Sequence, residues 1–486
     1  MEKTIFLLFL GFGMALNAQS LQVADLFGNN MVLQQGRENP IWGITKPMDT
    51  VTIMCNSEIR TCVSDQQGNW QLRLPILPQG KEYIIEINTN NEQRIFSHVA
   101  VGEIWLASGQ SNMLWQIGAG ITNLEETLKD ANYPDIRYFR VESGVSEKPE
   151  KFLEPSKSDN HWGKCDNDSL RYLSAVAYLF AKKIHLEQNV PVGIITSVMG
   201  GTCIEAWTSR DMLSTNLKIR SEFKKLDAEN LHWKEEQKKN KSERQFQNLP
   251  SALFNAMINP IIPFGIRGVI WYQGEQNVGA TDYHDFFSYL INDWRIRWGI
   301  GYFPFLYVQL ANLEQGAEGD ENLPILRESQ LKCSSIPNTG MVTTIDIGDP
   351  NDVHPRNKLD VGNRLYLWAK KLVYGAGYLV SSGPVFESYE LIKNKVLINF
   401  SSVGDGLLLK EDKAGSGFEI AGTDGEFYPA TVIIIEDKLE VQSVSVAAPK
   451  TVRYAWRSNP PATLYNKNGL PASPFRTDYW KVKQLR

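Results

Sequence analysis

Hydrophobic and polar positions alternate in short runs over the first hundred residues, and turn residues separate the runs. This alternation predicts a small β-sandwich-like module over residues 19–98, because successive side chains of a strand point to opposite faces. The runs are MVLQQ (31–35), NPIWGIT (39–45), DTVTIMC (49–55), NWQLRLPIL (69–77) and EYIIEINTN (82–90).

From Val101 the pattern changes to apolar segments that alternate with amphipathic ones, which predicts an α/β unit over residues 99–377. The predicted strands are EIWLAS (103–108), VGIITSVMG (192–200), RGVIWYQG (267–274), FPFLYVQLA (303–311) and TGMVTTIDIG (339–348). The predicted helices are LSAVAYLFAKKIHLEQ (173–188), PSALFNAMINPII (250–262), DYHDFFSYLINDWRIRW (282–298), ENLPILRESQLK (321–332) and the segment 356–375. Such an order favours a parallel sheet with helices on both faces and a ligand crevice at the carboxyl ends of the strands.

Two further segments differ in character from this unit. Residues 212–247 are strongly charged, which predicts a solvated helical insertion. Residues 378–486 return to β patterning with Gly, Asp and Asn turns, which predicts a C-terminal β-rich module. Its strand candidates are KVLINFSS (395–402), GLLLKE (406–411), GFEIAG (417–422), ATVIIIE (430–436), KLEVQSV (438–444) and TVRYAW (451–456).

The first 18 residues are typical of a cleavable signal peptide. Lys3 precedes an apolar run from Ile5 to Leu16, and the small residue Ala18 follows at the expected cleavage point. The run of about 12 residues is shorter than the roughly 20 that a membrane span needs. We therefore expect a protein without a membrane anchor that is periplasmic or secreted.

Composition narrows the possible partners and cofactors. The formal net charge of −5 gives no overall attraction to nucleic acid or to anionic membranes. Five cysteines are too few for a disulfide framework in 486 residues, although Cys55 and Cys62 are close enough for a local bridge. No Cys or His spacing typical of zinc sites occurs, so we expect no metal and no cofactor. Thirteen Trp and 18 Tyr suit a sugar-binding cleft as well as core packing.

A serine at the end of the first α/β strand is a candidate nucleophile. The strand EIWLAS leads directly into Gly109, Gln110 and Ser111, and a serine at a helix start has free backbone N–H groups beside it. Taken alone, a serine at such a position is more often a helix N-cap. Ser111 therefore needs a general base nearby before it indicates catalysis.

Position singles out one of the six histidines as the candidate base. His354 follows the strand TGMVTTIDI within a polar loop, where catalytic groups of a parallel sheet gather. Asp352 and Asp349 are near enough in sequence to orient its imidazole. Surface or structural roles suit four of the others, which are His98, His185, His232 and His284.

Two more strand ends carry groups that could hold an oxyanion. Gly201 follows VGIITSVMG and can present a bare backbone N–H, and Gln273 and Asn277 follow GVIWY with side-chain amide donors. An ordinary turn and a polar loop are the alternatives for these positions. The order of nucleophile, glycine donor, amide donor and Asp/His pair is the block order of SGNH/GDSL hydrolases.

The chain resembles the sialate O-acetylesterase family within that superfamily. The motifs that carry the resemblance are FGNNMVLQQ, IWG, VGEIWLASGQSNM, GGTCIEAW, PSALFNAMINPIIPFGIRGVIWYQGEQN and DVHPRNK, which together span residues 25 to about 370. The resemblance implies an SGNH-hydrolase-like three-layer α/β/α domain. It also implies a Ser111 nucleophile, a His354 base, and an oxyanion hole made by the backbone N–H groups of Ser111 and Gly201 and by Gln273.

The sequence departs from the superfamily pattern at two of these positions. The third oxyanion donor of the superfamily is an Asn in a GxND block, so Gln273 is assigned by its place at the strand end, with Asn277 as the fallback. The superfamily aspartate stands three residues before the His, where this chain has Asn351. Asp352 is assigned as the acid, and Asp349 or a bare Ser-His pair stays open.

The function that the resemblance implies is removal of O-acetyl groups from sialic acid. Arg210 or Arg356 would bind the sialate carboxylate. A second hypothesis is an acetylesterase acting on a plant polysaccharide such as xylan or xyloglucan. A third, from another class, is a non-catalytic carbohydrate-binding protein, which the flanking β modules and the Trp content would suit.

Overall fold

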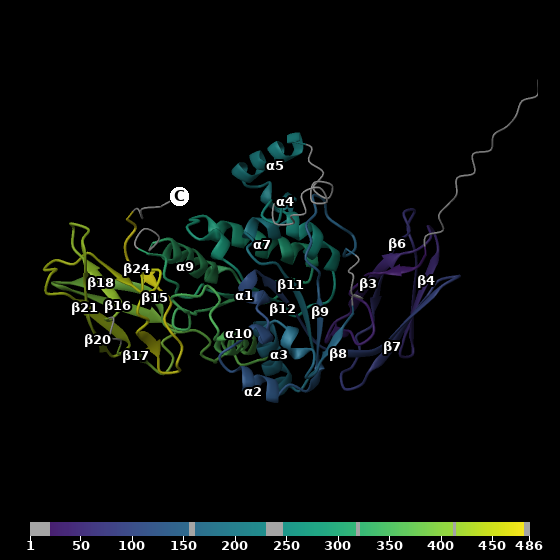
Figure 1. The fold of residues 1–486 in the computed structure, drawn as a ribbon, viewed down its shortest axis with the longest axis horizontal. Helices are drawn as coiled ribbons and strands as arrows, with labels where there is room; N and C mark the ends of the chain where they lie inside the picture. The colour runs from purple at the N-terminus through teal and green to yellow at the C-terminus, as the bar shows by residue number, and fades with distance from the viewer. Residues whose placement is uncertain (1–19, 155–160, 230–245, 317–320, 412–414, 481–486) are drawn as a thin grey trace, which may run out of the picture.

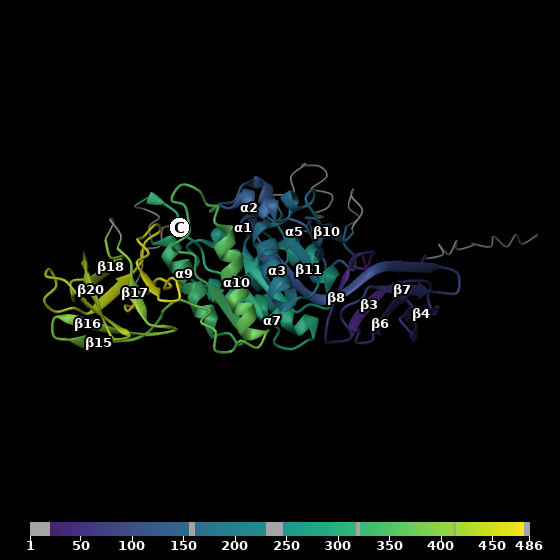
Figure 2. The ribbon, with the colours of Figure 1, turned by 90° about the horizontal axis from the view of Figure 1, so that it is seen from below.

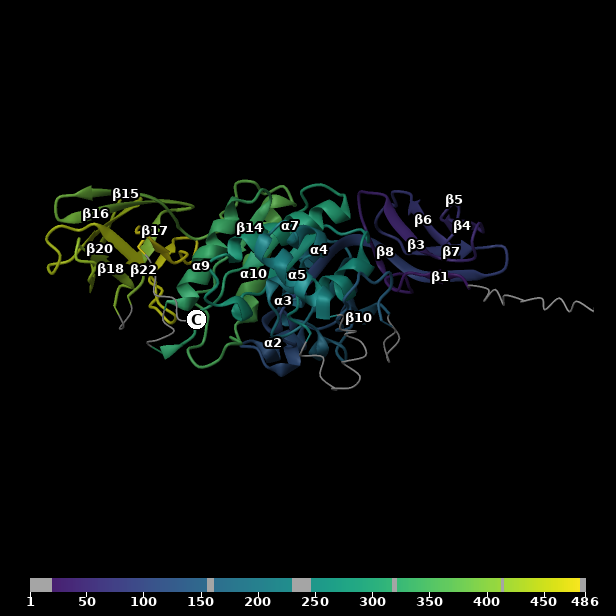
Figure 3. The ribbon, with the colours of Figure 1, turned by 90° about the horizontal axis from the view of Figure 1, so that it is seen from above.

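The structure is a computed structural model that describes residues 20–154, 161–229, 246–316, 321–411 and 415–480. A β-rich N-terminal part, a central α/β part and a β-rich C-terminal part follow one another along the long axis of the molecule (Figure 1, Figure 3). The expected signal peptide and residues 230–245 of the charged insertion both lie outside the described residues. Within the described chain, no helix has the length and apolar character needed to cross a membrane.

The central part is built on a mostly parallel sheet, as the alternation of strands and helices predicts. Its strand order is β10-β9-β11-β8-β12-β13-β14, and β10 alone runs antiparallel to its neighbour. The strands are β8 (Gln93–Gly109), β9 (Tyr133–Arg140), β10 (Gly163–Cys165), β11 (Val192–Val198), β12 (Gly268–Tyr272), β13 (Phe305–Val308) and β14 (Thr339–Val342). Chain order reverses around β8, between β11 and β12, and such a reversal opens a crevice at the carboxyl ends of the strands.

Helices cover both faces of this sheet (Figure 1). On one face α3 (Ala175–Gln188) packs against α10 (Lys358–Leu372), and on the other α7 (Tyr283–Trp298) packs against α9 (Asn322–Lys332). The hydroxyl of Ser174 caps α3 and the side chain of Asn357 caps α10, each by accepting a backbone N–H from the first turn. Shorter helices are α1 (Ser111–Leu114), α2 (Leu124–Lys129), α4 (Arg210–Leu213) and α5 (Leu217–Glu229).

The N-terminal part is joined to the central sheet by a single continuous strand. β8 is 17 residues long and pairs with β7 in its first half and with β11 and β12 in its second half (Figure 2). The buried residues of both parts form one hydrophobic core. The strands are β1 (Gln22–Val23), β2 (Val32–Gln34), β3 (Asn39–Ile44), β4 (Thr50–Cys55), β5 (Glu58–Val63), β6 (Asn69–Leu74) and β7 (Tyr83–Asn88).

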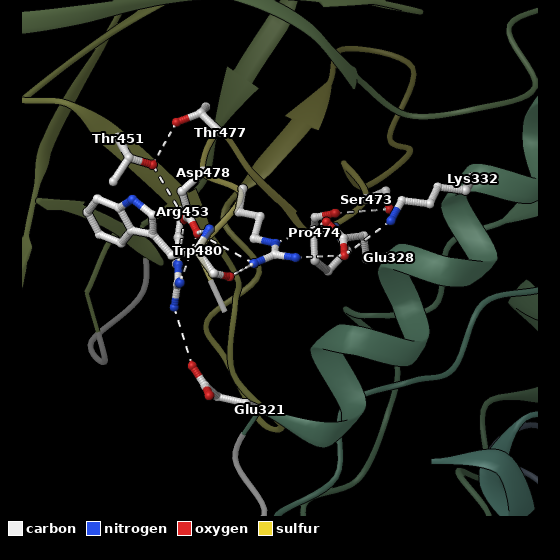
Figure 4. A network of polar contacts seen from close by, with 11 residues as sticks. Glu321, Glu328, Lys332, Thr451, Arg453, Ser473, Pro474, Thr477, Asp478 and Trp480 are labelled. Atoms are coloured by element: carbon white, nitrogen blue, oxygen red, sulfur yellow. Dashed lines mark hydrogen bonds and ion pairs between the residues drawn. The ribbon is translucent and has the colours of Figure 1, made fainter. Parts of the chain in front are cut away.

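The C-terminal part consists of antiparallel strands around a second hydrophobic core. The strands are β15 (Val385–Ile392), β16 (Lys395–Ser401), β17 (Leu407–Leu409), β18 (Phe418–Ala421), β19 (Phe427–Pro429), β20 (Thr431–Ile435), β21 (Lys438–Gln442), β22 (Thr451–Tyr454), β23 (Leu464–Asn466) and β24 (Phe475–Arg476). This part docks on α9 through ion pairs (Figure 4). Arg476 binds Glu328 at 3.0 Å, and Arg453 lies 3.4 Å from Glu321.

Two details differ from the expectations for local structure. The segment 250–262 forms a π-helical turn (Phe254–Ile258) and a 3₁₀ turn (Asn259–Ile261) instead of an α-helix, because Pro260 has no N–H to donate.

All five cysteines are free thiols. In the β4–β5 hairpin Cys55 lies opposite Glu58 and Cys62 lies opposite Val51, so the local bridge considered for these two cysteines is not formed.

Candidate active site

Ser111 lies at the carboxyl end of β8, where the chain turns into α1. It is the first residue of this four-residue helix, and Gln110 occupies the N-cap position without a side-chain capping bond. The capping alternative for Ser111 therefore does not describe this turn. The Ser111 side chain is partly exposed at the point where the strand order reverses.

Two glycines allow the chain to pass close to Ser111. Gly109 has φ +127°, and a Cβ there would stand 2.2 Å from the carbonyl oxygen of Tyr272 in β12. A Cβ on Gly200, after β11, would stand 3.4 Å from the Ser111 Cβ. The ends of β8, β11 and β12 thus converge on the candidate nucleophile.

His354 lies in the loop between β14 and α10, as its position in the sequence predicts. The residues next to it and to Ser111 are in contact, because the Asn112 Nδ2 donates to the Val353 carbonyl oxygen at 2.9 Å. The imidazole stacks on the indole ring of Trp115, with ring centroids 4.9 Å apart. The candidate nucleophile and base therefore come from elements that touch each other.

The environment of His354 favours its neutral form. Burial is the largest effect and lowers the pKa of His354, the charge of Lys358 lowers it further, and Arg356 adds a smaller lowering. The nearby carboxylate of Asp352 opposes them. A neutral imidazole is the form that can accept a proton from a serine hydroxyl.

Asp352 is the carboxylate nearest to the imidazole, but the two are not hydrogen-bonded through their side chains. Its Oδ1 lies 3.7 Å from the His354 Nδ1 and accepts the His354 backbone N–H at 2.8 Å. Its Oδ2 lies 3.4 Å from the guanidinium of Arg356. Asp349 instead accepts the backbone N–H of Asn351. Asp352 thus shapes the loop that carries His354 and interacts with the ring electrostatically.

The glycine loop after β11 is held by amide side chains. Gly201 has φ +68°, and its carbonyl oxygen accepts hydrogen bonds from the Gln247 Nε2 at 3.0 Å and from the Asn248 Nδ2 at 3.1 Å. These bonds fix the Gly201–Thr202 peptide. The Gly201 N–H belongs to the preceding peptide. Neither Gln247, the last residue of the charged segment 212–247, nor Asn248 after it was a candidate in the sequence.

The two amide side chains after β12 are engaged within the protein. The buried Gln273 Nε2 donates to the Thr202 carbonyl oxygen at 2.9 Å and to the Asn277 Oδ1 at 2.8 Å. Asn277 in turn donates to Glu205 and accepts the backbone N–H of Ile204. Both hydrogens of the Gln273 amide are used in this way, so donation to a substrate oxyanion would require one of these bonds to break.

The two candidate arginines have different surroundings. Arg210, at the start of α4, binds Asp227 of α5 with two hydrogen bonds of 2.9 and 2.5 Å and lies over the ring of Phe223. Arg356 lies 4.5 Å from the centroid of the Trp115 ring that also stacks on His354. Only Arg356 of the two is thus next to the candidate base.

Comparison with known proteins identifies the family to which this site belongs. Residues 101–366 match the family described as carbohydrate esterase, sialic acid-specific acetylesterase, and the matched range contains every candidate residue above. The chain is a member of this esterase family. Membership makes the protein a carbohydrate O-acetylesterase, and it confirms the family resemblance seen in the motifs.

Named relatives agree with this assignment. The sialate O-acetylesterases of Mus musculus and Homo sapiens are each 29% identical to the chain, which covers 93% and 91% of their lengths, and 93% of the chain is matched in both cases. A crystal structure described as a novel carbohydrate acetylesterase from Xanthomonas citri is 36% identical, with a TM-score of 0.85. The match covers 95% of this chain and 100% of that one, so the resemblance includes the flanking β parts.

The candidate site also contains three polar residues, Asn112, Glu275 and Lys358, that were not predicted from the sequence. Besides its bond to the Val353 carbonyl, Asn112 donates to Glu275 Oε1 at 2.5 Å, and its Oδ1 accepts from the Lys358 Nζ at 2.5 Å. The three side chains come from α1, from the turn after β12 and from α10. Each belongs to a motif that carries the family resemblance, but periodicity and spacing alone do not show that they meet.

Proposed function

We propose that this esterase removes O-acetyl groups from sialic acid through an acyl-enzyme on Ser111, with His354 as the general base. The observation that carries the proposal is the hydrogen bond from Asn112 to the Val353 carbonyl, because it joins the residues beside the nucleophile and the base. The family and the printed names of the sialate O-acetylesterases support the substrate. A Ser-His pair at the crevice of a parallel sheet suits acyl transfer.

The proposed reaction has two stages. His354 takes the proton of the Ser111 hydroxyl, and the oxygen attacks the acetyl carbonyl to form a tetrahedral oxyanion. As the oxyanion collapses, the protonated imidazole gives its proton to the departing sugar hydroxyl, which leaves Ser111 acetylated. Water, deprotonated by His354, then attacks the acetyl-serine, and the imidazolium returns that proton to the Ser111 oxygen as acetate is released. Because Asp352 lies beside Nδ1, the Nε2 is the nitrogen that exchanges the proton with Ser111.

The proposed oxyanion hole consists of the backbone N–H groups of Ser111 and Gly201. The positive φ of Gly201 and the contact of 3.5 Å from the Gln247 Nε2 to the Gly200 carbonyl oxygen, which is in the same peptide as the Gly201 N–H, support a fixed orientation of this donor. Gln273 and its fallback Asn277, the side-chain donors expected from the sequence, act in this proposal on the Thr202 carbonyl and the Ile204 N–H. They position the glycine loop without reaching the substrate.

Arg356 is the proposed partner of the sialate carboxylate. Its side chain is 46% exposed, and its guanidinium lies over the Trp115 ring that stacks on His354. Arg210 is a weaker choice because Asp227 already occupies its paired donors.

A neutral acetylated polysaccharide such as xylan or xyloglucan is the second candidate substrate. The observation that favours it is the engagement of both candidate arginines within the protein. Arg356 donates to the Ala119 carbonyl oxygen at 2.6 Å and lies near Asp352, and Arg210 is bound to Asp227. A neutral glycan needs no free cation in the pocket.

Acetate release from O-acetylated sialic acid and from acetylated xylan separates these two substrates. The proposal predicts a kcat/KM at least about tenfold higher on the sialate, which corresponds to about 1.4 kcal/mol of transition-state binding. It also predicts that Arg356→Gln loses that preference while hydrolysis of the neutral ester 4-nitrophenyl acetate is retained. A preference for xylan, unaffected by Arg356→Gln, would overturn the sialate assignment and leave the esterase reaction in place.

We infer that residues 99–377 form an SGNH-type three-layer domain. Support comes from the block order, in which Ser111, Gly201, Gln273 and His354 each follow a different strand of the parallel sheet. The C-terminal module over 378–486 has its own core, which supports its treatment as a separate domain. The module over 19–98 shares its core with the central part, so we propose that these two fold together.

A cleavable signal peptide over residues 1–18 and export to the periplasm or medium complete the proposal.

A further inference from the structure

Next to the proposed Ser-His pair, Asn112, Glu275 and Lys358 form a largely buried polar cluster that the proposed reaction does not use. The side chain of Lys358 is 1% exposed and that of Asn112 is 2% exposed. The Oε2 of Glu275 is also buried and has no hydrogen-bond partner within the described chain. Buried polar and charged groups destabilise a folded protein unless they are paired. We therefore ask what these three side chains do beside the proposed active site.

We propose that Asn112, Glu275 and Lys358 are positioning residues that fix Ser111 against His354, with the ammonium group of Lys358 held on the Asn112 side chain beside the loop that carries His354. The inference rests on the proposed roles of Ser111 and His354. Lys358 and Glu275 touch neither the substrate nor the reacting atoms in this proposal, and they act through Asn112 and His354.

The geometry of Asn112 supports the positioning role. Its amide nitrogen donates to both the Val353 carbonyl and the Glu275 carboxylate, while its carbonyl oxygen accepts from Lys358. Both N–H groups of the Asn112 amide are thereby used, so these hydrogen bonds fix the side chain in one orientation. Because Asn112 follows Ser111 and Val353 precedes His354, this orientation sets the separation of nucleophile and base.

The position of Lys358 in this cluster also has an electrostatic consequence for His354. Burial lowers the pKa of Lys358 to about 7, against the opposing influence of Glu275 and Asp352 and with a further lowering by Arg356. Burial raises the pKa of Glu275, which its bond from Asn112 and the charge of Lys358 oppose. Lys358 therefore carries its positive charge below about pH 7.

The positive charge of Lys358 acts on His354 in the same pH range in which His354 titrates. The charged groups that act on His354 are Lys358 and Arg356, which lower its pKa, and Asp352, which raises it. Since the pKa of His354 is below the ordinary histidine value, the ring titrates where Lys358 is still cationic. Loss of the Lys358 charge should thus raise the pKa of His354 and restrict the neutral base to higher pH.

Lys358→Met tests this effect directly. The acid limb of kcat/KM for 4-nitrophenyl acetate should move to higher pH by at least about half a unit, since a like charge has been removed. Lys371→Met removes a charge from the same helix α10 and should leave the limb in place. If Lys358→Met fails to fold, the double variant with Glu275→Gln avoids an unpaired buried carboxylate, and the same shift is expected from it.

Asn112→Ala tests the positioning role. kcat should fall by about 10- to 100-fold with KM within about twofold, because a small displacement of the reacting groups affects turnover and not binding. An unchanged kcat in the folded variant would overturn the positioning role. An acid limb of Lys358→Met that coincides with that of the wild type would overturn the charge effect.

A measurement without turnover separates this inference from the proposed reaction. NMR titration of the His354 imidazole, assigned with His354→Gln, should give a higher pKa in Lys358→Met than in the wild type. If the wild-type protein cleaved no acetyl ester, the proposed function would fail, and the titration would still decide whether Lys358 controls His354. Equal pKa values in both proteins would overturn the inference even in an active esterase.

Discussion

At the scale of single residues, the surroundings of His354 determine what the site can do. Trp115 stacks on one face of the imidazole, and Asp352 accepts the backbone N–H of the same residue. Stacking and burial keep water from part of the ring, which disfavours the imidazolium. In the proposed reaction, burial and these neighbours, and not a hydrogen-bonded carboxylate, would keep His354 in the neutral form that accepts a proton.

The lowered pKa of His354 predicts the pH dependence of the esterase. Because the proposed reaction requires the neutral ring, kcat/KM should fall only as the pH drops through the lowered value, and activity should persist below the ordinary histidine pKa of about 6.5. A pH profile of kcat/KM with 4-nitrophenyl acetate measures this limb. An acid limb centred above pH 7 would contradict the assigned environment of the base.

Asp352→Ala should lower kcat by at least about tenfold, and by less than the roughly 10⁴-fold that a serine protease loses with its aspartate. The loss is expected because the backbone N–H of His354 and the guanidinium of Arg356 both lose their acceptor. The acid limb should move to lower pH, since Asp352 raises the pKa of His354. Steady-state kinetics provide both values, and near-full activity would show that the acid is assigned wrongly.

Sequence position made Ser111 and His354 candidates, because each lies in the segment between an apolar strand of the sheet and the next helix, and the family resemblance supplied their roles. It could not show the role of Gln273, whose amide faces the Thr202 carbonyl. Strand-end spacing gives the neighbourhood of a side chain but not its hydrogen-bond partner. The bond from Lys358 to Asn112 was hidden for the same reason, since the two are 246 residues apart.

At the scale of elements, the turn from β8 into α1 depends on the backbone of Gly109. Gly109→Ala should destabilise the protein by at least about 3 kcal/mol, because its Cβ would collide with the Tyr272 carbonyl oxygen in a backbone region that favours glycine. Gly299→Ala, at the end of α7, is the matched control. Its φ is +64° with open space around it, so about 1–2 kcal/mol is expected. Chemical denaturation measures both, and equal losses would contradict the steric explanation.

The elements that the sequence predicted are those with strong hydrophobic periodicity. The segments expected as β11 and α7 have this character and occur within a few residues of their predicted ends. β9 was missed because its sequence, YPDIRYFR, mixes charged and aromatic residues. Its Arg137 is buried and donates to the Asn30 carbonyl oxygen and to Glu82 of the N-terminal part, a tertiary role that a local pattern cannot indicate.

At the scale of the whole molecule, the two β parts are attached to the centre in different ways. The N-terminal part continues into the central sheet through β8 and shares its core. The C-terminal part has a separate core and is held to α9 by ion pairs (Figure 4). The sequence indicated a module at each end. It could not show that the N-terminal module is continuous with the central sheet, because β8 crosses the expected boundary without a turn.

Two cations that share Glu328 test how the C-terminal part is attached. Arg476 is 12% exposed and also contacts the buried Asp478, so Arg476→Ala should cost at least about 2 kcal/mol. Lys332 is 58% exposed and lies 3.5 Å from the same carboxylate, so Lys332→Ala should cost no more than about 0.5 kcal/mol. Differential scanning calorimetry compares the two. Equal effects would show that burial does not govern this interface.

The central claim, that Ser111 is the nucleophile of an acetylesterase, is tested most directly by acetate release from O-acetylated sialic acid. Ser111→Ala should fold like the wild type and release no acetate above the uncatalysed rate. The control Ser334→Ala changes an exposed serine outside the site and should keep wild-type activity. Undiminished acetate release by folded Ser111→Ala would contradict the account.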